Sequence, residues 1–164
     1  MPTTDKHHLD HHYDAELAEV RQLLLRMGGL IEQMMAAAVK ALRERDTLLA
    51  RRVEQMDVEV DSLEKEVDAR CIMLVARRQP AASDLRFIAS AFKIVTDLER
   101  IGDLAVNLGE RVEELNRESP IQPRVDIPRM ATSVQAMVAD SLDAFVRGMP
   151  VSRSASSTAT RTST

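Results

Sequence analysis

Residues 49–76 read LARRVEQMDVEVDSLEKEVDARCIMLVA, and one series of their apolar residues recurs at steps of three or four positions, with a final step of seven. Those positions are Leu49, Val53, Met56, Val60, Leu63, Val67 and Leu74. This spacing follows the 3.6-residue period of an α-helix and places the apolar side chains on one face. The cations Arg77 and Arg78 then precede Pro80, a pattern typical of a helix C-terminus. The stretch therefore predicts one long amphipathic helix.

The segments on either side of this helix repeat the same spacing. The earlier apolar series is Leu17, Val20, Leu24, Met27, Ile31, Met34, Ala38 and Leu42, and the later one is Ile88, Ala91, Val95, Leu98, Gly102, Ala105, Gly109 and Val112. We expect the first helix to begin near Leu9 and to end near Arg45. Short connections between long helices force neighbours to run antiparallel. Residues 9–116 therefore predict an all-α, antiparallel three-helix bundle.

A fourth helix is predicted for residues 127–149, after a polar linker at 117–126. It opens at Ile127-Pro128, and proline is favoured at the first helical position. Its apolar series is Met130, Val134, Met137 or Val138, Leu142 and Phe145. A constant offset of 103 residues relates this segment to the first helix, with Arg26-Met27 matching Arg129-Met130. Such an offset indicates an internal repeat of a three-helix unit.

The second copy of this repeat is incomplete in the sequence. Where its next helix would begin, residues 150–164 are dominated by Ser and Thr, with too few apolar residues to form a packed core. We expect a disordered tail there and a flexible N-terminus at residues 1–8. The predicted fold is thus the three-helix bundle plus one helix of an unfinished second repeat.

Composition excludes several classes of function. The chain has 164 residues and a formal net charge of −4, with acids and bases interspersed, so it lacks the basic surface that nucleic-acid binding needs. No apolar run is long enough to form a transmembrane segment, and the N-terminus lacks the apolar region of a signal peptide. The single cysteine, Cys71, cannot form an internal disulfide. These features predict a cytoplasmic protein.

Carboxylates follow the apolar faces of the second and third helices. Asp57 and Asp61 lie one turn apart beside the second seam, as do Glu99 and Asp103 beside the third. Further acids on the same edges are Glu64, Asp68 and Glu110. Four carboxylates that converge from two helices would repel one another, and a hard cation such as Mg, Mn, Ca or Fe(III) would relieve that repulsion.

Two other interpretations of these acids remain open from the residues alone. The acidic edges could be ordinary solvated flanks paired with nearby cations, namely Arg51, Arg52, Lys65, Arg70 and Arg100. They could also serve metal storage or a metal enzyme. A ferritin-like di-iron site needs Glu-x-x-His pairs in the bundle, whereas all four histidines lie between His7 and His12. No catalytic motif is visible, so the sequence predicts a protein that is not an enzyme.

Four strings of the sequence resemble the PhoU family. Residues 78–88 read RQPAASDLRFI and residues 93–103 read KIVTDLERIGD, and both are similar to signature segments of that family. Residues 27–32 and 57–64 are similar to family segments in the first and second helices. The resemblance extends from about Leu9 to Met149.

The resemblance implies a function as well as a fold. Family members consist of two tandem three-helix bundles and act as accessory proteins of phosphate-specific transport. They are negative regulators of phosphate uptake and of phosphate-starvation two-component signalling. The implied partners are the cytoplasmic side of a phosphate ABC transporter and a sensor histidine kinase. The implied location is the cytoplasm, with peripheral association at the inner membrane, and the implied assembly is a homodimer.

The resemblance also implies metal binding. Family acidic motifs hold Fe, Mn, Mg or Zn ions, and they match Asp57, Asp61, Glu99 and Asp103 in this sequence. We therefore expect a metal-binding adaptor. The alternatives are a structural helical interaction module without metal and a carboxylate-metal storage protein.

Overall fold

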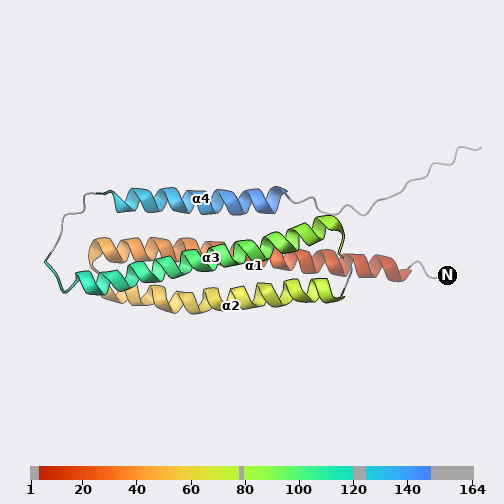
Figure 1. Ribbon diagram of the computed structural model, residues 1–164, viewed down its shortest axis with the longest axis horizontal. Coiled ribbons are helices and arrows are strands. Elements are labelled where there is room, and N and C mark those ends of the chain that lie inside the picture. The colour runs from red at the N-terminus through yellow and green to blue at the C-terminus, as the bar shows by residue number, and fades with distance from the viewer. Residues whose placement is uncertain (1–3, 78–79, 120–124, 149–164) are drawn as a thin grey trace, which may run out of the picture.

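The computed structural model describes residues 4–77, 80–119 and 125–148, apart from the side chains of residues 4–12 and 148. These residues form four α-helices and no strand: α1 Thr4–Glu44, α2 Thr47–Arg77, α3 Ala82–Leu115 and α4 Ile127–Gly148. Helices α1, α2 and α3 run antiparallel in sequence order, and α4 lies along one side of them (Figure 1). The predicted all-α fold, a three-helix bundle with a fourth helix, is confirmed.

The core of the bundle consists of the three predicted seams. Met27, Ile31 and Met34 of α1 are fully buried, and so are Val60 and Val67 of α2. The buried residues of α3 include Ile88, Ala91, Val95, Leu98, Gly102, Ala105, Gly109 and Val112. Because each seam holds aliphatic, small and methionine side chains with few aromatic rings, the three helices pack closely along their whole length.

The start of the first helix differs from the sequence prediction. Helix α1 begins at Thr4, inside the segment 1–8 that we expected to be flexible. No proline or glycine lies between Thr4 and Met27, and Asp5 adds a negative charge near the positive end of the helix dipole, so the helix begins earlier than expected. Residues 120–124 of the expected linker and the expected tail 150–164 lie outside the described residues.

Hydrogen bonds at one end of the bundle fix α3 against the α1–α2 turn. The Asn116 side chain accepts from Arg45 Nε at 3.0 Å and donates to Thr47 Oγ1 at 2.8 Å. Asp46 accepts from the Leu49 backbone N–H at 3.0 Å, which caps the start of α2. Since these bonds join the end of α3 to the start of α2, they set the register of the two helices that carry the acidic edges.

Helix α4 folds back antiparallel along α1 (Figure 1). Leu142 is buried and reaches the space above Gly28, where a Cβ atom would lie 2.1 Å from a Leu142 methyl carbon. Gln135 Nε2 donates to the Glu32 carbonyl oxygen at 3.0 Å. The Phe145 ring stacks on Phe87 of α3 with a centroid distance of 5.4 Å.

The apolar series predicted for α4 is only half covered. Leu142 and Phe145 face the bundle as expected, but Met130, Val134 and Met137 are 58%, 41% and 67% exposed. Of the alternatives Met137 and Val138, the structure packs Val138 against the core and leaves Met137 exposed. Helix α4 packs mainly along α1 and contacts α3 near its C-terminal end through Phe145, and one main neighbour covers a narrower face than two would.

The adjacent glycines of α1 give a matched test of this contact. A Cβ at Gly29 meets nothing within 4 Å, whereas one at Gly28 collides with Leu142. We predict that Gly29→Ala raises the free energy of unfolding by about 0.5–1 kcal/mol through helix propensity. Gly28→Ala should not give this stabilisation, because the new Cβ forces Leu142 to move. The double variant Gly28→Ala with Leu142→Ala should recover part of the stabilisation. Urea denaturation of the three variants measures the effect, and equal stabilisation by both single variants would contradict the described contact.

Candidate functional site

Five carboxylates gather where the middle of α2 faces α3. We call them the acidic cluster: Asp57, Asp61, Glu64, Glu99 and Asp103. The first three lie on α2 beside its buried seam, and the last two lie on α3. All are half-buried except Asp103, which is exposed. The structure thus brings together all four residues that the sequence singled out.

A glycine lets these carboxylates approach one another. Gly102 lies on α3 between Glu99 and Asp103, and it is buried. A Cβ atom there would lie 3.4 Å from Asp57 Oδ1 and 3.0 Å from Ile31 Cδ1. Because Gly102 has no side chain, the Asp57 carboxylate sits directly against the backbone of α3.

The cluster carries unfavourable charge. Burial raises the pKa of Asp57 above its ordinary value, and the neighbouring carboxylates Asp61 and Asp103 raise it further. The pKa of Glu99 is also raised, first by burial, then by Asp103 and Glu64 and by a side-chain hydrogen bond with Asp103. Like charge contributes to both shifts, so the folded chain holds these groups close against their mutual repulsion.

Two of the nearby basic residues, Arg51 and Arg70, pair with acids outside the cluster. Arg51 donates to Glu113 at 2.8 Å, and Arg70 pairs with Glu66 of its own helix and Glu19 of α1. Across residues 13–77, 80–119 and 125–147, no ion pair includes a carboxylate of the acidic cluster. No described ion pair therefore balances these five side chains, and the alternative of ordinary solvated flanks stays open.

The donor set of the cluster suits a hard cation in its chemistry, since every available ligand atom is a carboxylate oxygen. The positions of these oxygens fit a bound cation less well than their chemistry does. In the described part of the chain, no three His, Cys, Asp or Glu side chains are placed so that they could hold a metal ion as they stand. A metal would therefore require several of these half-buried side chains to turn toward a common point.

Glu64 belongs to the cluster although the sequence prediction left it out of the metal set. The signal was available, because Glu64 lies seven positions after Asp57 on the same acidic edge of α2. Asp68, another acid on this edge of α2, is not a member of the acidic cluster. Asp68 faces Cys71, and burial followed by the Asp68 charge raises the pKa of that thiol to about 11.

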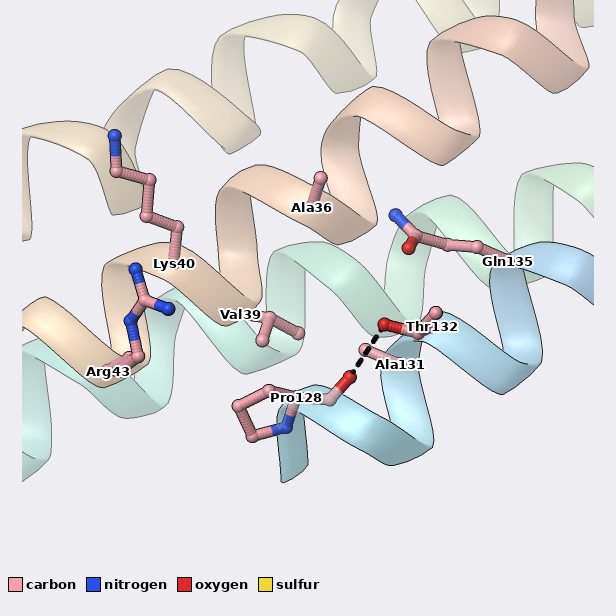
Figure 2. Close-up of a pocket in the computed structure, with 8 residues that line it drawn as sticks. All are labelled: Ala36, Val39, Lys40, Arg43, Pro128, Ala131, Thr132 and Gln135. Carbon is pink, nitrogen blue, oxygen red and sulfur yellow. Dashed lines mark hydrogen bonds between the residues drawn. The ribbon is translucent and has the colours of Figure 1, made fainter. Parts of the chain in front are cut away.

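A shallow pocket of about 200 Å³ lies between α1 and α4 (Figure 2). Its lining includes Lys40, Arg43, Thr132 and Gln135. Both cations already pair with Glu44, and Figure 2 shows them extending away from α4. Thr132 donates to the Pro128 carbonyl and Gln135 donates to α1, so the polar groups of the pocket are engaged within the chain.

Crossing a lipid bilayer requires a long and strongly apolar helix. None of the four helices, over the parts described, is both long enough and apolar enough to do so.

Comparison with known proteins places this fold and its acidic cluster in a family. The family model for the PhoU domain matches residues 24–112, a range that contains every member of the cluster. The chain belongs to the PhoU family. The expected family is thereby confirmed.

Relatives of the chain include two phosphate-specific transport system accessory protein PhoU homologs. The one from Pseudomonas putida is 46% identical over 86% of this chain and 56% of its own length. The one from Pseudomonas aeruginosa is 45% identical over 86% of this chain and 59% of its own length. The crystal structure of PhoU from P. aeruginosa matches with a TM-score of 0.78, 43% identity, and coverage of 82% of this chain and 65% of that chain. The chain spans less than two thirds of these relatives.

The raised carboxyl pKa values predict how stability depends on pH. An acid whose pKa is higher in the folded state loses its proton first in the unfolded chain, so it destabilises the fold as pH rises above about 4. Asp57→Asn should therefore raise the free energy of unfolding at pH 7, by roughly 0.5 kcal/mol, the order expected for like charges one turn apart. The gain should fade below about pH 4.

Glu59→Gln is the matched control for this change. Glu59 lies on the same helix but pairs with Arg26 of α1, so neutralising it should not stabilise the protein. Chemical denaturation of both variants at several pH values measures the difference. Equal behaviour of the two would show that Asp57 experiences no net repulsion.

Proposed function

We propose that this protein is a regulatory adaptor of a phosphate-specific transport system and acts as a negative regulator of phosphate uptake and phosphate-starvation signalling. Membership of the PhoU family carries the proposal, together with relatives at 45–46% identity that are named accessory proteins of that system. Those relatives match over 86% of this chain, which includes the acidic cluster.

The proposed adaptor is not an enzyme and acts by docking. Its partners are the cytoplasmic side of a phosphate ABC transporter and a sensor histidine kinase, and it resides in the cytoplasm, peripherally associated with the inner membrane. The long α2 and α3 helices support this role, because together they offer a rigid surface whose middle carries concentrated negative charge. Fixed charge of one sign contributes to partner choice and to the rate of association.

The acidic cluster is proposed as a cation site with Asp57, Asp61, Glu99 and Asp103 as ligands. A bound cation would neutralise charge that no side chain in the described part of the chain now balances. Carboxylate oxygens favour Mg, Mn or Fe over Zn, which prefers nitrogen and sulfur ligands. Neutralisation would change the potential of the α2–α3 surface, and this would link cation binding to docking.

A second candidate is an interaction module without metal. The observation that favours it is that no group of side chains in the described residues is arranged to hold a metal as it stands. In that case the cluster itself would be the docking surface, for a basic segment of a partner. A carboxylate-metal storage protein is a less well supported third candidate, because one cluster on a narrow helical surface offers little capacity.

Deletion of the encoding gene tests the regulatory role. Alkaline phosphatase activity in high phosphate should become constitutive, and the wild-type gene should restore repression. A variant carrying Asp57→Asn, Asp61→Asn, Glu99→Gln and Asp103→Asn should fail to restore it if the cluster is needed. Unchanged phosphatase activity after deletion would refute the proposed function.

Thermal unfolding separates the metal proposal from the regulatory one. Mn²⁺ at 100 times its dissociation constant should stabilise the folded chain by about 2.7 kcal/mol, which corresponds to roughly 5–10 °C in Tm. The same four-residue variant should lose this shift, whereas Glu113→Gln, which removes an acid paired with Arg51, should keep it. An absent shift in the wild-type protein, with repression intact, would favour the module without metal.

A further inference from the structure

Three exposed apolar residues gather at the end of the bundle where α2 ends and α3 begins. We call them the apolar patch: Ile72, Val75 and Leu85, which are 60%, 42% and 50% exposed. They lie close to the helix ends, since α2 ends at Arg77 and α3 begins at Ala82. Single exposed apolar residues are common on protein surfaces, whereas apolar residues grouped in one place are typical of interaction sites. The patch is therefore a candidate contact site for another molecule.

The apolar patch lies on the same side of the bundle as the acidic cluster. On α2, Val75 follows Asp57 by eighteen residues. On α3, Leu85 precedes Asp103 by the same number. Eighteen residues make five whole turns of an α-helix, so the two members of each pair project in the same direction, about 27 Å apart. Asp57 lies against Gly102, the residue before Asp103. Because α2 and α3 run antiparallel, Val75 then lies level with Leu85 (Figure 1).

Ile72 connects the two parts of this α2–α3 surface. It follows Asp61 by eleven residues, about three turns, and Asp68 lies on the same edge of α2 between them. The surface is thus acidic over its middle and apolar at one end. Helix α4 leaves it open, because α4 packs along α1 and has no contact with α2. Where α4 reaches α3 it does so at Phe87, which lies on the other flank of α3 from Leu85.

We propose that the α2–α3 surface binds an amphipathic α-helix of a partner protein, with apolar residues of that helix on the apolar patch and Lys or Arg residues over the acidic cluster. A helix suits this surface because its own side chains return to the same direction after five turns, so one side of it meets both parts. The partner helix needs about 20 residues, with its cations and its apolar residues roughly 11–18 positions apart. The inference rests on the proposed adaptor function and specifies the kind of segment that the adaptor recognises.

Charge selects this partner over other molecules with an apolar surface. A molecule that covers the whole α2–α3 surface meets five carboxylates, and no ion pair formed within residues 13–77, 80–119 and 125–147 balances them. Lys and Arg side chains are attracted there, whereas an anionic membrane surface or a nucleic acid is repelled. An uncharged apolar segment would contact the patch alone.

Complementation of the gene deletion tests the surface in the cell. Leu85→Glu should lose repression of alkaline phosphatase in high phosphate, because it buries an unpaired charge in the contact. The matched control is Leu104→Glu, which alters a 61% exposed leucine of α3 that lies about 100° around the helix from Leu85, and it should repress normally. Immunoblotting and circular dichroism confirm that both variants are present and helical. Unchanged phosphatase activity after deletion would refute the adaptor function and this inference with it, whereas normal repression by Leu85→Glu would refute this inference alone.

Binding of a synthetic helix to the purified full chain gives the second readout. The probe is a fluorescent, Ala-rich peptide of about 24 residues, with two Lys near one end and two Leu about five turns away. Its dissociation constant, measured by fluorescence anisotropy, should rise at least about tenfold with Leu85→Glu and stay unchanged with Leu104→Glu. A second peptide has the two Leu moved by two positions, which turns them about 200° away from the Lys side, and it should bind more weakly by a similar factor.

Three results would overturn the proposal. The first is peptide binding that does not respond to Leu85→Glu, and the second is equal binding of the two peptides. The third is binding of the chain to phosphatidylglycerol vesicles that Leu85→Glu abolishes, which would assign the apolar patch to a membrane surface.

Discussion

The close approach of α2 to α3 is the constraint on which the remaining features depend. Two glycines on α3 permit it: a Cβ at Gly109 would lie 3.3 Å from the Ala50 carbonyl oxygen, and one at Gly102 would press on Ile31 and Asp57. At this separation the seams bury fully, and the carboxylates on their flanks are forced to face one another. The packing that stabilises the bundle thus also creates the charge repulsion of the acidic cluster.

Folding and function make opposing demands on these residues. Neighbouring carboxylates that raise each other's pKa reduce stability at neutral pH, and such groups concentrate at functional sites. A protein selected for stability alone would pair them with lysine or arginine, as it does for Glu59 and Glu113 nearby. The unpaired cluster is therefore the strongest physical indication that this surface binds a cation or a basic partner.

Periodicity alone predicted most of the fold and the positions of the four site residues. Helices α1, α2 and α3 pack against one another, so most of their predicted seam positions became core, and one-turn spacing placed Asp57 with Asp61 and Glu99 with Asp103. Helix α4 could not be predicted as well, because which half of a wide apolar face is covered depends on the number of neighbouring helices. Spacing also cannot fix side-chain rotamers, which decide whether carboxylates that face each other form a ligand set.

The most direct test of the account is a carboxyl-carbon NMR titration of Asp57 and Glu99, with and without Mg²⁺. The account predicts pKa values above the ordinary range for both groups in the metal-free protein, and a fall of both when the cation binds. The carboxyl-carbon signal of Glu59, which pairs with Arg26, should be unaffected by Mg²⁺. Ordinary pKa values for Asp57 and Glu99 that are indifferent to the cation would contradict the central claim that the fold forces unbalanced carboxylates together.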